Sequence, residues 1–118
     1  MTLGAAAQLT EILLAQHKDV DAERLARELL AARQKAAPNG WPRLAAGSQL
    51  GAALAGQHKF AEAEPLLLTS YDAMVQRKNT PAFDSDDVKL AGERIVQMYT
   101  DWRKPAQALE WKKKLAVP

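Results

Sequence analysis

Apolar residues in the middle of the chain recur at the spacing of two consecutive helices. The first set consists of Leu44, Gly47, Leu50, Gly51 and Leu54. A polar segment, GQHK at 56–59, interrupts the pattern, which then resumes with Ala63, Leu66, Leu67, Tyr71, Met74 and Val75. Spacing of three and four residues places side chains on one face of an α-helix. The pattern therefore predicts a hairpin of two helices that pack through their apolar stripes.

Extended along the whole chain, the same reasoning predicts six helices, at 3–16, 19–36, 42–57, 60–78, 85–102 and 105–116. Helix-breaking segments separate the hairpins: PNG at 38–40 and NTP at 79–81. Asp84, Ser85 or Asp86 supplies an N-cap for the fifth helix. No stretch alternates with the two-residue period of a strand, so we predict an all-α fold.

An internal repeat accounts for this regularity. Residues 16–25 (QHKDVDAERL) recur as residues 57–66 (QHKFAEAEPL), an offset of 41 at which six of ten positions are identical. A weaker third copy lies 45 residues further on. Four columns keep one register through the copies: Ala6, Gly47 and Gly92; Leu9, Leu50 and Ile95; Leu13, Leu54 and Tyr99; and Ala22, Ala63 and Ala108. We predict a single domain, 1–118, with repeats at approximately 3–36, 42–78 and 85–116.

The repeats resemble the tetratricopeptide repeat (TPR) family. The resemblance is carried by LGAAL at 50–54 and FAEAEPLL at 60–67, and the third copy is similar to the closing repeat of a longer bacterial variety. That copy supplies Ile95, Val96, Tyr99, Trp102, Pro105, Ala108 and Trp111. The resemblance implies a right-handed superhelix of three helical hairpins that acts as a protein-binding scaffold. Because the longer variety often follows serine/threonine protein kinase domains, it also implies a regulatory part of a larger bacterial protein.

The chain departs from the family pattern in its turns and its repeat length. The glycine that is usual in the turn within a repeat is replaced by His17, His58 and Arg103. The early Trp of the family's first helix is Gly or Ala, and the Pro that closes each repeat is missing. The periods of 41 and 45 exceed the minimal period of about 34 and imply longer helices or connections.

Composition excludes several classes of function. The chain has no Cys, which excludes disulfides, thiolate catalysis and Cys-ligated zinc. Its 16 basic and 14 acidic residues give a net charge of +2, so nucleic-acid binding has no compositional support beyond the lysines at 112–114. No apolar stretch approaches the ~20 residues of a membrane span, and the N-terminus lacks the basic region of a signal peptide. We expect a soluble, cytoplasmic protein without membrane insertion.

Each residue that could take part in catalysis, metal binding or ligand binding also has a structural interpretation. His17 and His58 occupy equivalent helix-ending turns, so they are not expected to share a metal ion. The acidic cluster at 84–87 is interpreted as an N-cap, because an EF-hand loop spreads its ligands over twelve residues. The basic C-terminal end is interpreted as a solvated helix end, and Trp41, Trp102 and Trp111 as packing residues. No nucleophile–base set or phosphate loop is present, so the sequence predicts no enzyme, cofactor or metal site.

The surface that remains is the concave side of the repeat stack, which is lined by the first helix of each hairpin. The predicted binding residues on this side are Gln8, Glu11, Ser48, Gln49, Ala52, Arg94, Gln97 and Asp101. We expect Arg94 to be exposed and to anchor a peptide there, with Gln49 and Gln97 beside it. The alternative is self-association, because a three-repeat array leaves apolar end faces that can pair two chains.

Overall fold

The computed structural model describes residues 1–116 and contains six α-helices in that range. They are α1 (Leu3–Ala15), α2 (Asp19–Ala36), α3 (Trp41–Gly56), α4 (Phe60–Gln76), α5 (Ser85–Asp101) and α6 (Pro105–Ala116). The all-α prediction is confirmed, and most helix ends lie within one residue of those expected. Helix α4 ends two residues before the predicted position. Helix α3 begins one residue early, at Trp41, because Pro42 is accommodated in its first turn.

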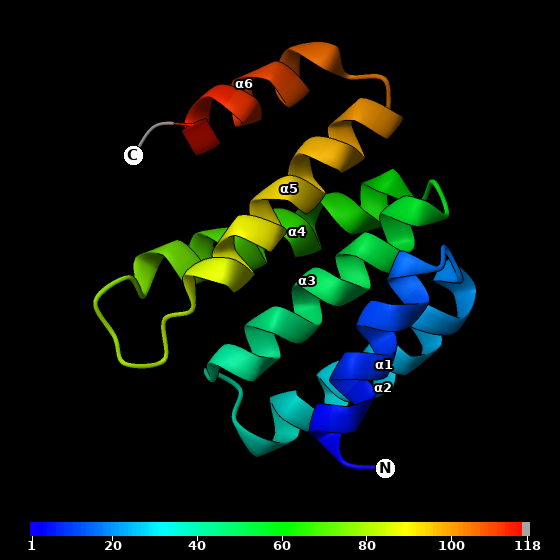
Figure 1. The fold of residues 1–118 in the computed structure, drawn as a ribbon, viewed down its shortest axis with the longest axis vertical. Coiled ribbons are helices and arrows are strands. Elements are labelled where there is room, and N and C mark those ends of the chain that lie inside the picture. Colours follow the sequence, from blue (N-terminus) through cyan, green and yellow to red (C-terminus); the bar gives the residue numbers. More distant parts are fainter. Residues whose placement is uncertain (117–118) are drawn as a thin grey trace.

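The helices form three successive hairpins that stack on one another. Helices α1 and α2, α3 and α4, and α5 and α6 pack as neighbours in sequence, while α2 also contacts α3 and α4 contacts α5. The first helices of the hairpins meet as well, since α3 contacts both α1 and α5. Figure 1 shows α1, α3 and α5 in front of α2 and α4, with α6 at the end of the molecule remote from the N-terminus.

The hydrophobic core is centred on α3. Leu44, Leu50 and Leu54 are at most 3% exposed, as the predicted stripe requires. They join side chains of α2, α4, α5 and α6 in one continuous apolar cluster. On α4, Leu67 and Met74 are buried as predicted, whereas Val75 is 41% exposed. The assignment of Val75 to the packing stripe was therefore wrong, because this side chain remains open to solvent while the adjacent Met74 is buried.

Small residues bring the two helices of a hairpin close together at repeat-equivalent positions. A Cβ atom added to Gly47 would lie 2.8 Å from the Ser70 hydroxyl oxygen, closer than atoms in contact can lie. A Cβ atom on Gly92, 45 residues later, would lie 2.7 Å from a methyl carbon of Leu115, which is itself 45 residues after Ser70. The second and third hairpins thus pack in the same register.

Each hairpin turn ends its first helix in the same way. His17, His58 and Arg103 have φ angles of 58°, 61° and 60°, in the left-handed region that usually favours glycine. The Lys59 N–H donates to the Leu54 carbonyl at 3.0 Å, and the His58 N–H donates to that of Ala55 at 2.9 Å. The equivalent bonds join Lys18 to Leu13, His17 to Leu14, Lys104 to Tyr99 and Arg103 to Thr100. This is the Schellman motif, so the turn keeps its geometry although glycine is replaced.

Candidate functional site

A groove with a volume of about 400 Å³ opens where α1, α3 and α5 meet. Its apolar part is formed mainly by Leu29, Trp41, Ala45, Met74 and Leu90. Leu29 comes from α2 and Met74 from α4, so the second helices of two hairpins also contribute to the lining. The volume falls within the ~300–1,000 Å³ that is typical of ligand sites.

Two contacts fix the orientation of Trp41 in this groove, one with α5 and one with the segment that precedes α5. Its indole Nε1–H donates to a carboxylate oxygen of Asp87 at 2.8 Å. Its ring meets that of Phe83 edge to face, with 5.7 Å between the ring centroids. Asp87 is itself placed at the start of α5, where its backbone N–H donates to the capping side chain of Asp84. A buried tryptophan with its N–H satisfied gives the groove a rigid aromatic wall.

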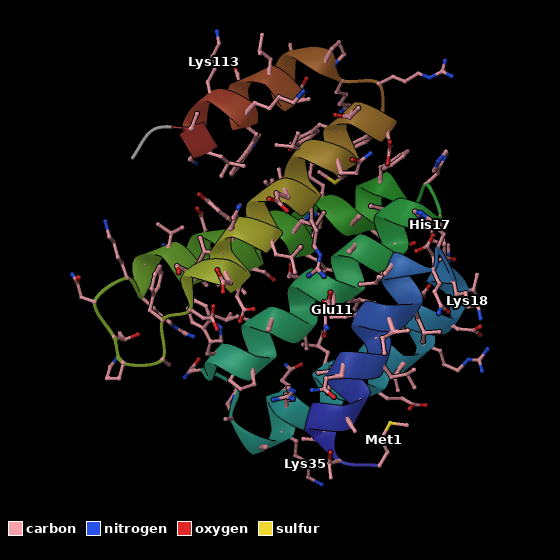
Figure 2. All side chains as sticks on the ribbon, viewed as in Figure 1. Met1, Glu11, His17, Lys18, Lys35 and Lys113 are labelled. Atoms are coloured by element: carbon pink, nitrogen blue, oxygen red, sulfur yellow. The ribbon has the colours of Figure 1, made fainter. Side chains whose placement is uncertain are left out.

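A polar network crosses the groove from the first hairpin to the third. Arg94 donates through Nη2 to Oε1 of Glu11 at 2.5 Å and through Nη1 to the Ser48 hydroxyl at 3.1 Å. Gln49 Nε2 donates to the same Glu11 oxygen at 2.9 Å and to the Ala7 carbonyl at 3.1 Å. Figure 2 shows Glu11 where α1 faces α3. The two residues of the ion pair lie 83 positions apart in the chain.

Five of the eight predicted binding residues line this groove, and three do not. The five are Gln8, Glu11, Ser48, Gln49 and Arg94. Ala52, Gln97 and Asp101 are not part of its lining, and the Gln97 amide instead donates to Asp101 at 2.9 Å along α5. The predicted positions therefore separate into a groove set and a set nearer the C-terminal ends of α3 and α5.

The accessibility of the central groove residues differs from the sequence-based expectation. Ser48 and Gln49 are 2% and 6% exposed, because α3 is covered on both sides by neighbouring hairpins. The expectation that Arg94 is exposed was wrong, since only 13% of its side chain is accessible. Its guanidinium lies against Glu11 and Ser48 instead of facing solvent.

Sequence reasoning missed part of the groove. Trp41 and Met74 were assigned to packing alone, and Leu29 and Arg33 were not considered because they belong to the second helix of their hairpin. The one available signal was the position of Trp41 before Pro42, at a helix start that faces the next hairpin. Whether side chains of α2 and α4 reach the groove depends on how the hairpins are tilted against one another. No local sequence pattern indicates that tilt.

Two glutamates at equivalent repeat positions hold successive hairpins together outside the groove. Glu23 accepts hydrogen bonds from Gln57 at 2.7 Å and from Arg27 at 2.8 Å. Lys59 Nζ lies 3.4 Å from Oε1 of the same carboxylate. The bond from Gln57, followed by that from Arg27, lowers the pKa of Glu23 to about 2.

The second of these glutamates is Glu64, 41 residues after Glu23. It accepts a hydrogen bond from the Tyr99 hydroxyl at 2.7 Å. Burial of the phenol, together with this bond, raises the pKa of Tyr99 to about 12. Both glutamates therefore reach from the second helix of one hairpin to the next hairpin, and they fix the stacking on which the groove depends.

The other residues that the sequence analysis considered lie in structural settings. Asp84 is the N-cap of α5 and accepts bonds from the backbone of Asp86 and Asp87, which confirms its predicted capping role. Trp102 stacks on Phe60 with 5.4 Å between the ring centroids, and Trp111 packs edge to face on Tyr71 with 5.1 Å between the centroids.

The lysines of the C-terminal part are partly engaged with these aromatic rings. Lys104 lies 3.7 Å from the Trp102 ring centroid, and Lys114 lies 4.3 Å from that of Trp111. Within residues 1–116, no three His, Asp or Glu side chains gather as a metal-binding group. None of the helices in this range has the length and hydropathy needed to span a bilayer.

The chain matches no protein-family model, and comparison with curated proteins and with solved structures also gives no match.

Proposed function

We propose that this chain is a TPR-like helical-repeat scaffold that binds a segment of another protein, or a peptide, in the groove between α1, α3 and α5. The observation that supports this function is the groove itself, about 400 Å³ in volume and walled by the fixed indole of Trp41. Repeat stacks of this kind present extended concave surfaces, and binding there needs no chemistry beyond shape and a few polar contacts.

The lining favours a ligand with an apolar anchor. Ala45 and Leu90 line the groove beside Trp41 and are only half-buried, so an aliphatic or aromatic side chain of the ligand would bury apolar surface against them. The guanidinium of Arg33, which also lines the groove, forms no ion pair or hydrogen bond with other side chains in 1–116 and would attract a carboxylate next to the anchor. Apolar contact supplies the affinity, and Arg33 supplies orientation.

Arg94 has a different role from the one the sequence suggests. Its guanidinium is already paired with Glu11, so an acidic ligand would have to displace that carboxylate before it could bind. Asp87 is likewise engaged by Trp41. Because these charged groups already have partners within the groove, we propose that they shape a binding surface and do not act on a bound substrate.

Selection of binders from a displayed library of random peptides tests the proposal. Selected peptides are synthesised with a fluorophore, and their affinity is measured by fluorescence polarisation for the parent chain and for Ala45→Trp. Ala45 is only partly buried and lines the groove, so an indole there fills the space. We expect peptides with an apolar anchor to be enriched and Ala45→Trp to weaken their binding by at least about tenfold, or ~1.4 kcal/mol.

Lys113→Glu is the matched control, because Lys113 is exposed on α6, far from Glu11 in Figure 2. It should bind the selected peptides like the parent chain, and circular dichroism should show the same helical content for all three proteins. If Ala45→Trp binds as well as the parent while Lys113→Glu loses binding, the basic C-terminal end is the site and the groove proposal fails.

A further inference from the structure

Helix α1 carries an apolar stripe that the rest of residues 1–116 covers only in part. The stripe consists of Ala5, Leu9, Ile12 and Leu13, which recur at helical spacing, and we call it the N-terminal face. Ala5 is exposed, Leu9 and Leu13 are half-buried, and Ile12 is 52% exposed. Exposed apolar stripes on a repeat stack need an explanation, because terminal repeats usually present a polar outer side.

The residues equivalent to this stripe in the other two hairpins are buried. Its equivalents on α3 are Ala46, Leu50, Ala53 and Leu54, and all are at most 3% exposed. Its equivalents on α5 are Ala91, Ile95, Met98 and Tyr99, and all are at most 4% exposed. In both helices this side packs on the preceding hairpin: Ala46 clusters with Ala6 and Leu29, and Tyr99 binds Glu64. Helix α1 therefore has the residues of an internal repeat, although no hairpin precedes it within residues 1–116.

The opposite end of the molecule differs in character. Glu93 and Gln97 on α5 and Lys112 on α6 are exposed, and they share the lining of a hollow between the two helices with the apolar residues Val96, Leu115 and Ala116. Leu109 is the one large apolar residue of α6 that is strongly exposed, at 53%, and it lies beside Lys112 and Arg103. Packing this end onto the N-terminal face of another copy would bury charged groups without partners, which is costly.

We propose that two copies of this chain associate through their N-terminal faces, related by a two-fold axis. A face of this kind is complementary to itself, because apolar surface meets apolar surface in an isologous contact. The only ionisable residue of α1 is Glu11, whose carboxylate is bound by Arg94 within the groove. Two N-terminal faces thus meet without like-charge repulsion. This dimer does not depend on the groove function, which involves a different surface.

The size of the face sets the expected strength of the association. A helix of 13 residues is about 20 Å long, so contact through two α1 helices lies at the small end of specific interfaces. We therefore expect a reversible dimer with a dissociation constant on the order of micromolar.

Sedimentation velocity over a wide concentration range tests the proposal, with Ile12→Glu and Leu109→Glu as a matched pair. The two residues are almost equally exposed, at 52% and 53%, but lie at opposite ends of the stack. The parent chain and Leu109→Glu should shift from monomer to dimer as concentration rises, and Ile12→Glu should remain monomeric. Ile12→Ser, a milder change, guards against loss of folding in Ile12→Glu and should weaken the dimer at least about tenfold.

A single introduced cysteine then identifies the geometry, since the chain has no native Cys. Ile12→Cys should form disulfide-linked dimers on mild oxidation, whereas Leu109→Cys should not. A parent chain that stays monomeric at the highest concentration would overturn the proposal. So would a dimer that Leu109→Glu abolishes, or one in which cysteines at 12 and 109 cross-link only in a mixture of both variants, because that pattern indicates head-to-tail assembly.

Discussion

At the scale of single residues, buried or partly buried polar groups hold the hairpins in place. Gln57, at the end of α3, donates to Glu23 of the preceding hairpin and also to the carbonyl of Ala53 in its own helix. Tyr99 plays the corresponding role one hairpin later through Glu64. Glu23 and Glu64 are equivalent in the repeat, but Gln57 and Tyr99 are not, so the repeat alone does not identify the donor that each carboxylate meets.

The depressed pKa of Glu23 predicts a pH dependence of stability. Because this carboxyl has a pKa of about 2 in the folded chain and an ordinary value of 4.5, its contribution is complete above about 4.5. The contribution is lost as pH falls from there through about 2. Urea unfolding across this range should show a smaller loss of unfolding free energy for Glu23→Gln than for the parent chain.

Removal of the hydrogen-bond donor provides the reciprocal test. Gln57→Ala takes away the largest cause of the shift, so it should flatten the same part of the pH profile. A Glu23→Gln profile that falls as steeply as that of the parent would show that the bonds to Gln57 and Arg27 contribute nothing to folding stability.

At the scale of elements, the three left-handed turns explain why each hairpin reverses at the same place. A non-glycine residue in this region costs roughly 1–2 kcal/mol, and Asn tolerates it best. The chain uses His and Arg there, and the Schellman bonds offset part of the cost. The sequence predicted the turn residues correctly, while their conformation followed from the structure.

Substitution at His17 tests this account, because the side chain is exposed. The double variant His17→Asn, His58→Asn should retain nearly the stability of the parent, whereas His17→Val should be less stable than the parent, since a β-branched residue is more strained than His at positive φ. Denaturant midpoints measure both effects. Lys18→Val is the control, because the φ angle of Lys18 is −91°; equal losses at 17 and 18 would contradict the assigned turn.

At the scale of the whole molecule, the Glu11–Arg94 pair joins the first hairpin to the third across the groove. In a stack of repeats, contacts normally connect neighbours only. Here two long side chains link α1 to α5, whose backbones are not in contact. The link limits how far the groove between them can open.

A double-mutant cycle on Glu11→Ala and Arg94→Ala should measure this link. We expect a coupling free energy of about 1 kcal/mol that decreases with added salt, because Glu11 is 42% exposed and partly screened. The pair Asp21–Arg24, 3.5 Å apart and 58% and 72% exposed, is the control and should couple near zero. Equal coupling in the two cycles would show that Arg94 does not join the hairpins energetically.

The sequence by itself determined the helices, their ends and the register of the repeats. Helical periodicity, breakers at 38–40 and 79–81, and the repeated turn residues act over a few positions, so their effects can be inferred locally. Only the tertiary structure decided which groups meet across the stack. The burial of Ser48, the pairing of Glu11 with Arg94 and the lining from Leu29 and Met74 depend on the tilt between hairpins. That tilt accumulates from the packing of many side chains far apart in sequence, and no local pattern of residues encodes it.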